Sequence, residues 1–513
     1  MRLLLRGAAA RWAALRLFGG AFRSARGPLW RLGLGLGLAA TAVAVAGPDG
    51  GSEERPPGEP GFQRAVARSR DLLQRLKDEV GAPGVVVGVS VDGREVWAEG
   101  IGYADLENRV LCGPETVLRI ASISKSLTMV AVAKLWEEGK LDLDAAVQKY
   151  VPEFPEKEYE GEKVTISTRL LVSHLSGIRH YEKDISKVKE EKEKANRKAA
   201  RTAASAAKEK ENKETEKRDL IKGKPEQEGK NSKSGRKKRE FEHEEYYLKD
   251  KFEHVIDSLN IFQNDPLFFK PGSQFLYSTH GFTLLSAVVE RASNQKFTDY
   301  MLKIFSDLGM GSTGLDENEP LIYNRARYYI HNKKGHVINA PYVDNSYKWA
   351  GGGFVSTVGD LLRFGNAMLY SYQLGQVKNP GPGFLPGYLK PDTIAMMWTT
   401  VPQSQDYAYG MAWFIVEKKQ ECGHCKEQQH YTFHTGGAVG ASSVLLILPE
   451  ELNSGIANSS CLVPPHGVVI TVICNMQSVH LDGIALKIAK EFEKDRLVQR
   501  SDQRLERKCG RLE

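Results

Sequence analysis

The sequence predicts an α/β protein in which an antiparallel sheet of five or more strands is flanked by helices and accompanied by a mostly helical subdomain. Strand-like segments occur near both ends of the 513-residue chain, at 84–107 and at 409–476. They follow one another through hairpin-like links, which favour antiparallel pairing. The region between them is dominated by helical patterns. We therefore expect a single sheet built from both ends of the chain.

Each element of this fold has its own local signal. Residues 62–81 have the apolar spacing of an amphipathic helix. The next segment predicts two strands joined at Asp92-Gly93, because Asp-Gly is a strong hairpin signal. Near the other end, four strands and a closing helix are predicted at 409–418, 431–437, 442–450, 466–476 and 481–497.

The N-terminal region has the composition of a targeting segment. Residues 1–48 contain seven arginines and no acidic residue, which is typical of a mitochondrial presequence. The apolar stretch 32–46 within it is shorter than the roughly 20 residues that span a bilayer. It is therefore interpreted as a sorting segment for the inner membrane or the intermembrane space. A secretory signal peptide is the alternative, although arginines spread over 31 residues fit it less well.

A charged, low-complexity insert divides the rest of the chain. A Pro/Gly linker at 49–61 precedes the first part of the main domain, 62–181, and the insert follows at 182–240. The insert carries 21 lysines and arginines, 13 acidic residues and no aromatic residue, so it cannot bury enough surface to fold as a domain. The second part of the domain is expected at 241–498, with a C-terminal tail at 499–513. Because the presequence and the insert hold the excess positive charge, the domain itself is net acidic, and no nucleic-acid partner is expected.

The segment from Arg119 to Leu141 raises a chemical question. Ser122 and Lys125 are three residues apart at the start of a helix that is apolar on nearly every side and should end at Gly139. This spacing places both side chains on one face, about 5–6 Å apart. A buried lysine can accept the proton of a nucleophilic serine if burial and the helix N-terminus lower the lysine pKa. A serine at the helix N-cap with a lysine that reaches solvent is the alternative, since four other Ser-x-x-Lys matches occur in the chain.

Several further motifs give this pair a context. Ser122-Ile123-Ser124-Lys125 resembles the first motif of the serine β-lactamase and penicillin-binding-protein superfamily. The stretches at 170–178, 275–285, 350–364 and 434–437 resemble other segments of its class C and DD-peptidase branch, in the expected order. The resemblance covers residues 62–495 apart from the insert, and it implies a β-lactamase/transpeptidase-like fold.

The resemblance also implies roles for individual residues. Ser122 would be the acylated nucleophile, Lys125 its proton acceptor, and Tyr277 would pass the proton to the leaving group. The N–H groups of Ser122 and Gly437 would form the oxyanion hole. His434 and Thr435 would line the opposite wall and hold a substrate carboxylate or carbonyl.

One position departs from the family pattern. The family usually has asparagine two residues after the tyrosine, whereas this chain has Thr279, which is counted among the substrate-binding residues. A threonine hydroxyl reaches a substrate amide less well than an asparagine side chain does. Peptide or related amide and ester substrates are therefore favoured over β-lactams.

No metal or other cofactor is expected. Cys422 and Cys425 form a Cys-x-x-Cys pattern, but strand-like segments flank it, so a hairpin tip is favoured over a redox or zinc site. The six cysteines are too sparse for a disulfide scaffold.

Two functions from different classes follow. The first is a mitochondrial active-site serine hydrolase that acts through an acyl-enzyme on a small peptide-like substrate. The second is a non-enzymatic, self-associating scaffold that keeps the fold. Resemblance to a mitochondrial branch of the superfamily implies homo-oligomers or filaments, association with the inner mitochondrial membrane, and an effect on mitochondrial organisation or lipid metabolism.

Overall fold

The structure, a computed structural model, describes residues 60–184, 186–187, 190, 243–377, 384–404, 408–421, 426–450 and 465–509. The predicted presequence 1–48, nearly all of the insert 182–240, and Cys422 and Cys425 lie outside these residues. Among the helices that the structure describes, none is both long enough and apolar enough to cross a membrane.

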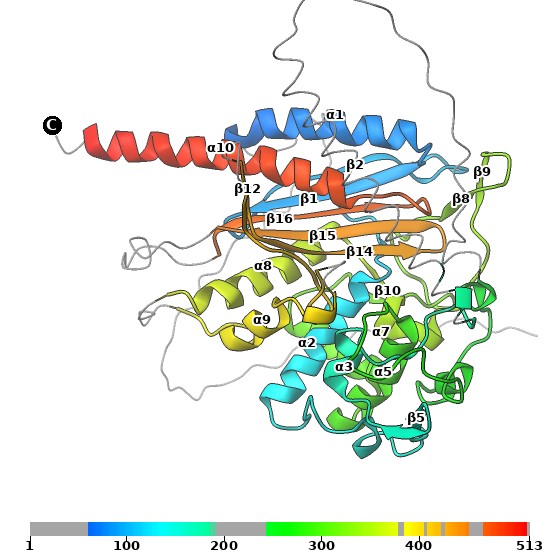
Figure 1. The fold of residues 1–513 in the computed structure, drawn as a ribbon. Helices are drawn as coiled ribbons and strands as arrows, with labels where there is room; N and C mark the ends of the chain where they lie inside the picture. Colours follow the sequence, from blue (N-terminus) through cyan, green and yellow to red (C-terminus); the bar gives the residue numbers. More distant parts are fainter. Residues whose placement is uncertain are drawn as a thin grey trace, which may run out of the picture. The chain divides into compact units, whose positions relative to one another are not determined.

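A seven-stranded antiparallel sheet forms the centre of the domain (Figure 1). Its strand order is β11-β14-β15-β16-β1-β2-β3, so β1 and β16, the first and last of the described strands in chain order, lie side by side. This confirms the predicted antiparallel sheet built from both chain ends. The strands are β1 Gly84–Val91, β2 Arg94–Asp105, β3 Val110–Leu111, β11 Phe414–Val416, β14 Tyr431–Ala438, β15 Ala441–Pro449 and β16 Gly467–Cys474.

The strand predictions are confirmed in position, and one differs in length. β1 and β2 form a hairpin about Asp92 and Gly93, whose φ angles of 49° and 80° match the two positive values of a type I′ turn. The segment 409–418 contains only the three-residue strand β11, because the chain around Tyr409 to Trp413 turns back on itself through hydrogen bonds such as Gly410 N–H to Trp413 O.

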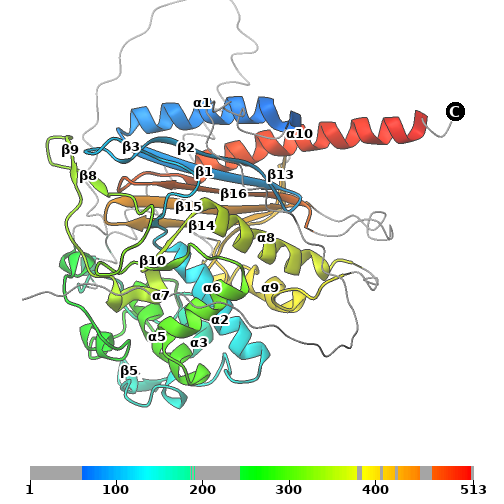
Figure 2. The same ribbon diagram turned by 180° about the vertical axis from the view of Figure 1, so that it is seen from behind.

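Two long helices cover one face of the sheet. α1 (Gln63–Glu79) packs against α10 (Asp482–Cys509), and α10 also contacts β15 and β16 (Figure 2). Phe492 of α10 lies between Phe62 and Trp97, with ring centroids 5.8 and 5.9 Å away. The predicted closing helix thus exists, but it continues twelve residues beyond 497, into the segment predicted as a tail. The sequence contains no glycine or proline in this extension to stop the helix.

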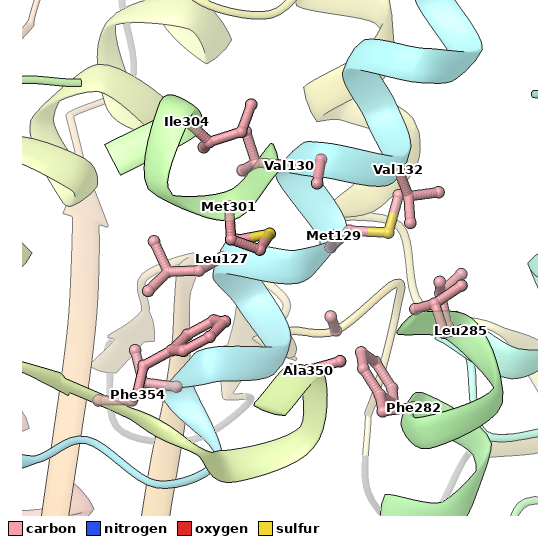
Figure 3. Close-up of a cluster of buried hydrophobic side chains, with 14 of the residues drawn as sticks. Leu127, Met129, Val130, Val132, Phe282, Leu285, Met301, Ile304, Ala350 and Phe354 are labelled. Carbon is pink, nitrogen blue, oxygen red and sulfur yellow. The ribbon is translucent and has the colours of Figure 1, made fainter. Parts of the chain in front are cut away.

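The opposite face of the sheet carries α8 and the mostly helical subdomain. α8 (Val358–Leu374) lies on β1, β15 and β16, and α2 (Ile123–Glu137) connects the sheet to the other helices. The close-up in Figure 3 shows α2 side chains between those of Phe282, Met301 and Phe354. The helix is apolar around its whole circumference and ends before Gly139, whose φ is 70°, as predicted. The other helices are α3 Thr168–Val172, α5 Thr279–Ser293, α6 Phe297–Asp307, α7 Trp349–Gly352 and α9 Pro391–Met397.

Four smaller sheets complete the described part of the domain. The first joins β4, β10 and β7, and it places the end of β4 directly before α2. The strands β12 and β13 pair as a hairpin on either side of Cys422 and Cys425. The strands are β4 Leu118–Arg119, β5 Lys157–Tyr159, β6 Glu162–Val164, β7 Gly314–Leu315, β8 Tyr329–His331, β9 Val337–Asn339, β10 Phe354–Ser356, β12 Lys419–Glu421 and β13 Lys426–Gln428.

Candidate active site

Ser122 lies at the junction between a strand and a buried helix. β4 ends at Arg119, and Ser122 is the N-cap residue of α2. Ala121 before it has a φ of 49°, a value that few residues other than glycine adopt, so the chain turns sharply here. Ile120 is fixed on the side of β10 by its N–H, which donates to Phe354 O over 3.1 Å. The turn therefore presents Ser122 at the positive end of the α2 dipole.

Strand β14 passes directly beside this turn. A Cβ atom added to Gly436 would lie 2.3 Å from Ile120 O and 3.0 Å from Ala121 Cβ. Only glycine fits at this distance, and its presence lets the β14 backbone approach the residues before the nucleophile. Thr435 and Gly437 flank Gly436 and are both partly exposed. The structure thus brings the predicted wall and oxyanion-hole residues next to the Ser122 turn.

Lys125 is fully buried and points back to the serine. Its Nζ lies 3.1 Å from Ser122 Oγ, donates to Gly351 O over 2.6 Å and lies 3.4 Å from Thr279 Oγ1. These contacting groups are neutral. Removing an ammonium from water into such surroundings favours its neutral form, which is the form that accepts a proton. The alternative of a lysine that reaches solvent is therefore wrong for this structure.

Tyr277 covers the amine from the other side. Lys125 Nζ lies 4.7 Å from the centre of the Tyr277 ring and 5.5 Å from that of Phe282. Tyr277 directly precedes α5, whose N-cap residue Ser278 accepts a hydrogen bond from Gly281 N–H. The methyl group of Thr279 fills the space beside Gly351, where an added Cβ would lie 2.7 Å away. Thr279 thus packs closely against the residue that binds Lys125.

Two histidines that were not among the predicted site residues hold this segment. His174 Nδ1 accepts a hydrogen bond from Ser278 N–H, and His180 Nδ1 accepts one from Thr279 N–H, each over 3.1 Å. The His174 ring also lies 4.3 Å from the Tyr277 ring. Burial lowers the pKa of His174 well below its ordinary value, so the ring stays neutral and can accept. His174 belongs to the stretch 170–178, one of the segments that carry the family resemblance, and this was the available sequence signal.

His434 lies on β14 at the predicted position, but its ring is 1% exposed. Its Nδ1 donates to Thr435 O over 2.7 Å, and its Nε2 accepts from the hydroxyl of Tyr409 over 3.1 Å. Burial lowers the pKa of His434 to about 3. Both ring nitrogens are therefore used inside the protein. Tyr409 was not predicted, since nothing in its local sequence signals a contact 25 residues away.

One group of side chains in the described residues has the composition of a cation site. It consists of Asp92, Glu450 and His466. Arg496 and Arg500 of α10 both contact the two carboxylates, so their charge is already balanced by guanidinium groups. These residues lie at the hairpin end of β1 and on the α10 side of the sheet, away from Ser122. They are a structural ion-pair cluster.

The fold and the arrangement around Ser122 are those of the β-lactamase-like serine hydrolase superfamily. The family model for Beta-lactamase matches residues 69–218 and 231–489, and the chain belongs to this family. The predicted family resemblance and fold class are thereby confirmed. Among curated relatives, "Serine beta-lactamase-like protein LACTB, mitochondrial" from Mus musculus is 65% identical over 456 residues, covering 86% of this chain and 82% of the relative. The protein of the same name from Homo sapiens is 66% identical, covering 85% and 81%.

Solved structures share the fold at low sequence identity. The octameric penicillin-binding protein homologue from Pyrococcus abyssi has a TM-score of 0.54 and 20% identity, covering 85% of this chain and 77% of that one. A class C β-lactamase has a TM-score of 0.54 and 16% identity, covering 84% and 96%. A hydrolase with promiscuous acyltransferase activity, EstCE1, has a TM-score of 0.57 and 18% identity, covering 84% and 99%.

Proposed function

We propose that this chain is a mitochondrial active-site serine hydrolase that acts through an acyl-enzyme on peptide or related amide and ester substrates. The observation that carries the proposal is the fully buried Lys125 amine 3.1 Å from Ser122 Oγ. A serine hydroxyl is a weak nucleophile until a neighbouring base takes its proton.

The residues suggest a complete reaction. Ser122 Oγ attacks the substrate carbonyl carbon as its proton passes to neutral Lys125 Nζ, and the carbonyl oxygen becomes an oxyanion facing the N–H groups of Ser122 and Gly437. Collapse of this intermediate breaks the bond to the leaving group, which receives the proton through Tyr277. Water then attacks the acyl carbon by the same route and releases a carboxylic acid and free Ser122. Each oxyanion-hole donor contributes roughly 3–4 kcal/mol of transition-state stabilisation.

A fluorophosphonate probe tests the nucleophile. Wild-type protein should be labelled once, and Ser122→Ala should not be labelled. Ser124→Ala is the matched control, because Ser124 lies two residues along the chain, is fully buried, and accepts a hydrogen bond from Phe354 N–H. An unlabelled wild type, or a labelled Ser122→Ala, would show that the assignment is wrong.

The mitochondrial location is part of the proposal. The arginine-rich, acid-free residues 1–48 and the names of the mouse and human relatives both support it. Placement in the intermembrane space and contact with the inner membrane rest on the apolar stretch 32–46. Protease protection of the chain in isolated mitochondria, before and after the outer membrane is opened, tests this placement.

The second candidate function is a self-associating scaffold, with or without turnover. The same fold occurs as an octamer in the Pyrococcus abyssi homologue, which supports self-association. Filaments and an effect on mitochondrial organisation or lipid metabolism extend this proposal. Light scattering at micromolar concentration tests it, and a monomer would contradict it. Normal assembly of an unlabelled protein would favour the scaffold over the hydrolase.

A further inference from the structure

His174 holds the chain on both sides of Tyr277. Its backbone carbonyl accepts a hydrogen bond from Leu276 N–H over 3.0 Å, and its Nδ1 accepts one from Ser278 N–H over 3.1 Å. Leu276 and Ser278 are the two residues next to Tyr277 in the chain. The imidazole also lies against the phenol ring, with centroids 4.3 Å apart. His174 therefore contacts Tyr277 with its ring and both neighbours of Tyr277 with hydrogen bonds.

This arrangement lowers stability at His174 itself. The residue has a φ of 58°, in the left-handed region that glycine adopts freely and that other residues adopt at a cost. A neutral ring that accepts through Nδ1 carries its proton on Nε2. The His174 ring is buried, and its Nε2 makes no hydrogen bond with any described atom. A buried donor without a partner is unfavourable. Strain of this kind is retained mainly where a functional site needs the residue that carries it.

We propose that His174 is a positioning residue whose Nδ1 acceptor fixes the Tyr277 phenol where it can pass a proton to the leaving group. Proton transfer requires the donor to lie within hydrogen-bond reach of the leaving atom. Residues 275–278 have no regular secondary structure, so contacts from outside this segment must set the direction of Tyr277. The inference rests on the proposed function and adds to it the residue that sets its proton path.

Such a role predicts an effect that depends on the leaving group. A 4-nitrophenoxide leaves as an anion without a proton, whereas an ethoxide needs one. Loss of a purely structural residue would lower kcat/KM equally for both esters. Loss of a residue that acts through Tyr277 would lower it mainly for the ethyl ester. The measured quantity is therefore the ratio of kcat/KM for 4-nitrophenyl N-acetylglycinate over that for ethyl N-acetylglycinate, two substrates that form the same acyl-enzyme.

Three variants separate the ring nitrogen from the packing. His174→Leu removes the acceptor, and His174→Asn keeps an acceptor oxygen near the position of Nδ1. His174→Gly also removes the acceptor but suits the φ of 58°, so it serves if the leucine variant does not fold. His280→Leu is the matched control, because His280 is a fully buried histidine of α5 whose Nε2 contacts the Glu245 carboxylate.

His174→Leu and His174→Gly should raise the ratio by about tenfold to 100-fold, the effect of a misplaced proton donor, and His174→Asn should stay within about threefold of wild type. His280→Leu should leave the ratio within about twofold of wild type. In Tyr277→Phe the ratio should already be high. Adding His174→Leu to Tyr277→Phe should change the ratio by less than about twofold, because the phenol that His174 positions is gone.

A wild-type ratio in a His174→Leu or His174→Gly protein that still reacts with fluorophosphonate would overturn the inference and leave the proposed function intact. The inference would also be wrong if His174→Asn or His280→Leu raised the ratio as much as His174→Leu does. A full further rise on adding His174→Leu to Tyr277→Phe would contradict it as well. Absence of labelling and of Ser122-dependent hydrolysis in the wild type would instead remove the proposed function, and this inference with it.

Discussion

The two sides of the central sheet bury polar groups in different ways. On the side of α2 and the helical subdomain, Lys125, His174 and His434 are buried beside neutral groups, and His280 is buried against the Glu245 carboxylate. His174 Nε2 and His280 Nδ1 make no hydrogen bond with described atoms. On the side of α1 and α10, the interior is aromatic and aliphatic, and the charges of Arg496 and Arg500 meet those of Asp92 and Glu450 at the rim. Buried polar groups that lack full compensation lower stability and are kept where chemistry needs them. The comparison therefore separates the side that carries the proposed site, called the reactive side below, from the α10 side, whose contacts serve stability.

The largest expected effect is on the reactive side. Lys125→Met should lower kcat at least about 1000-fold, because the base is lost while the chain fills the same space. Its free energy of unfolding should change by less than about 2 kcal/mol, since Gly351 O loses one donor. Ester hydrolysis and urea unfolding measure the two effects. Lys134→Met on the same helix is the control, because Lys134 Nζ contacts Tyr388 O and not the site. If Lys125→Met kept more than a tenth of the wild-type activity, Lys125 would not be the base, and the proposed contrast between the two sides of the sheet would be wrong.

The next effect is on the α10 side. Phe492→Ala should lower the free energy of unfolding by about 3–5 kcal/mol, because a fully buried ring is lost from contacts with Phe62 and Trp97. The kcat of the folded fraction should stay within about twofold of wild type, as this layer does not touch Ser122. Phe492→Leu should be milder in urea unfolding. A large fall in the kcat of fully folded Phe492→Ala protein would mean that the two sides of the sheet are coupled.

The third effect is the acid sensitivity of the reactive side. Burial lowers the pKa of His434 to about 3, whereas the unfolded value is about 6.5. At pH values between these two pKa values, the unfolded chain binds a proton at His434 and the folded chain does not. The free energy of unfolding therefore falls as the pH drops below about 6.5. The loss at pH 5 should be about 2 kcal/mol. Urea unfolding at pH 7 and at pH 5 measures this loss in the free energy of unfolding. The His434→Asn variant should lack the loss, whereas the His331→Asn variant, in which an exposed histidine is replaced, should keep it.

The smallest effect is the acid sensitivity of the α10 side. Burial alone would raise the pKa of Asp92, but the His466 side chain, Arg496, Gly467 N–H and Arg500 together lower it to about 2. The stability that this carboxylate contributes is present above its unfolded pKa of about 3.8 and is lost as the pH falls towards 2. Between pH 5 and pH 3, the free energy of unfolding of the Asp92→Asn variant should therefore fall by about 1 kcal/mol less than that of wild type, as measured by urea unfolding. Equal losses would show that Asp92 does not set this window.

The parts of the fold that the sequence predicted are those with strong local signals. Asp92-Gly93 predicted a hairpin because both residues accept positive φ, and the structure has it. The apolar run after Ser122 predicted a buried helix with its end at Gly139, and this is also observed. By contrast, β4, β7 and β10 are two or three residues long and are defined by partners far along the chain, so no local pattern indicates them.

The same difference between local signals and contacts over long sequence distances applies to the residues of the site. Ser122 and Lys125 are three residues apart, so helix geometry predicted their contact. Tyr277, Thr279 and the β14 residues were placed by family resemblance. The Tyr246 hydroxyl donates to Gly437 O across 191 positions and a charged insert, and such a contact has no sequence pattern at all. The burial of the His434 ring against Tyr409 was missed for the same reason.

The adjacency of β1 and β16 has a consequence for biosynthesis. β1, an interior strand of the sheet, pairs with a strand that is about 390 residues later in the chain, where Val86 lies opposite Ile473. On the ribosome, the β1–β2 hairpin therefore emerges long before the strand and the helix that complete its layer. Contacts of such separation form slowly and leave apolar edges exposed in the meantime. A nascent chain of this protein must be kept from premature association until its last segment has been translated.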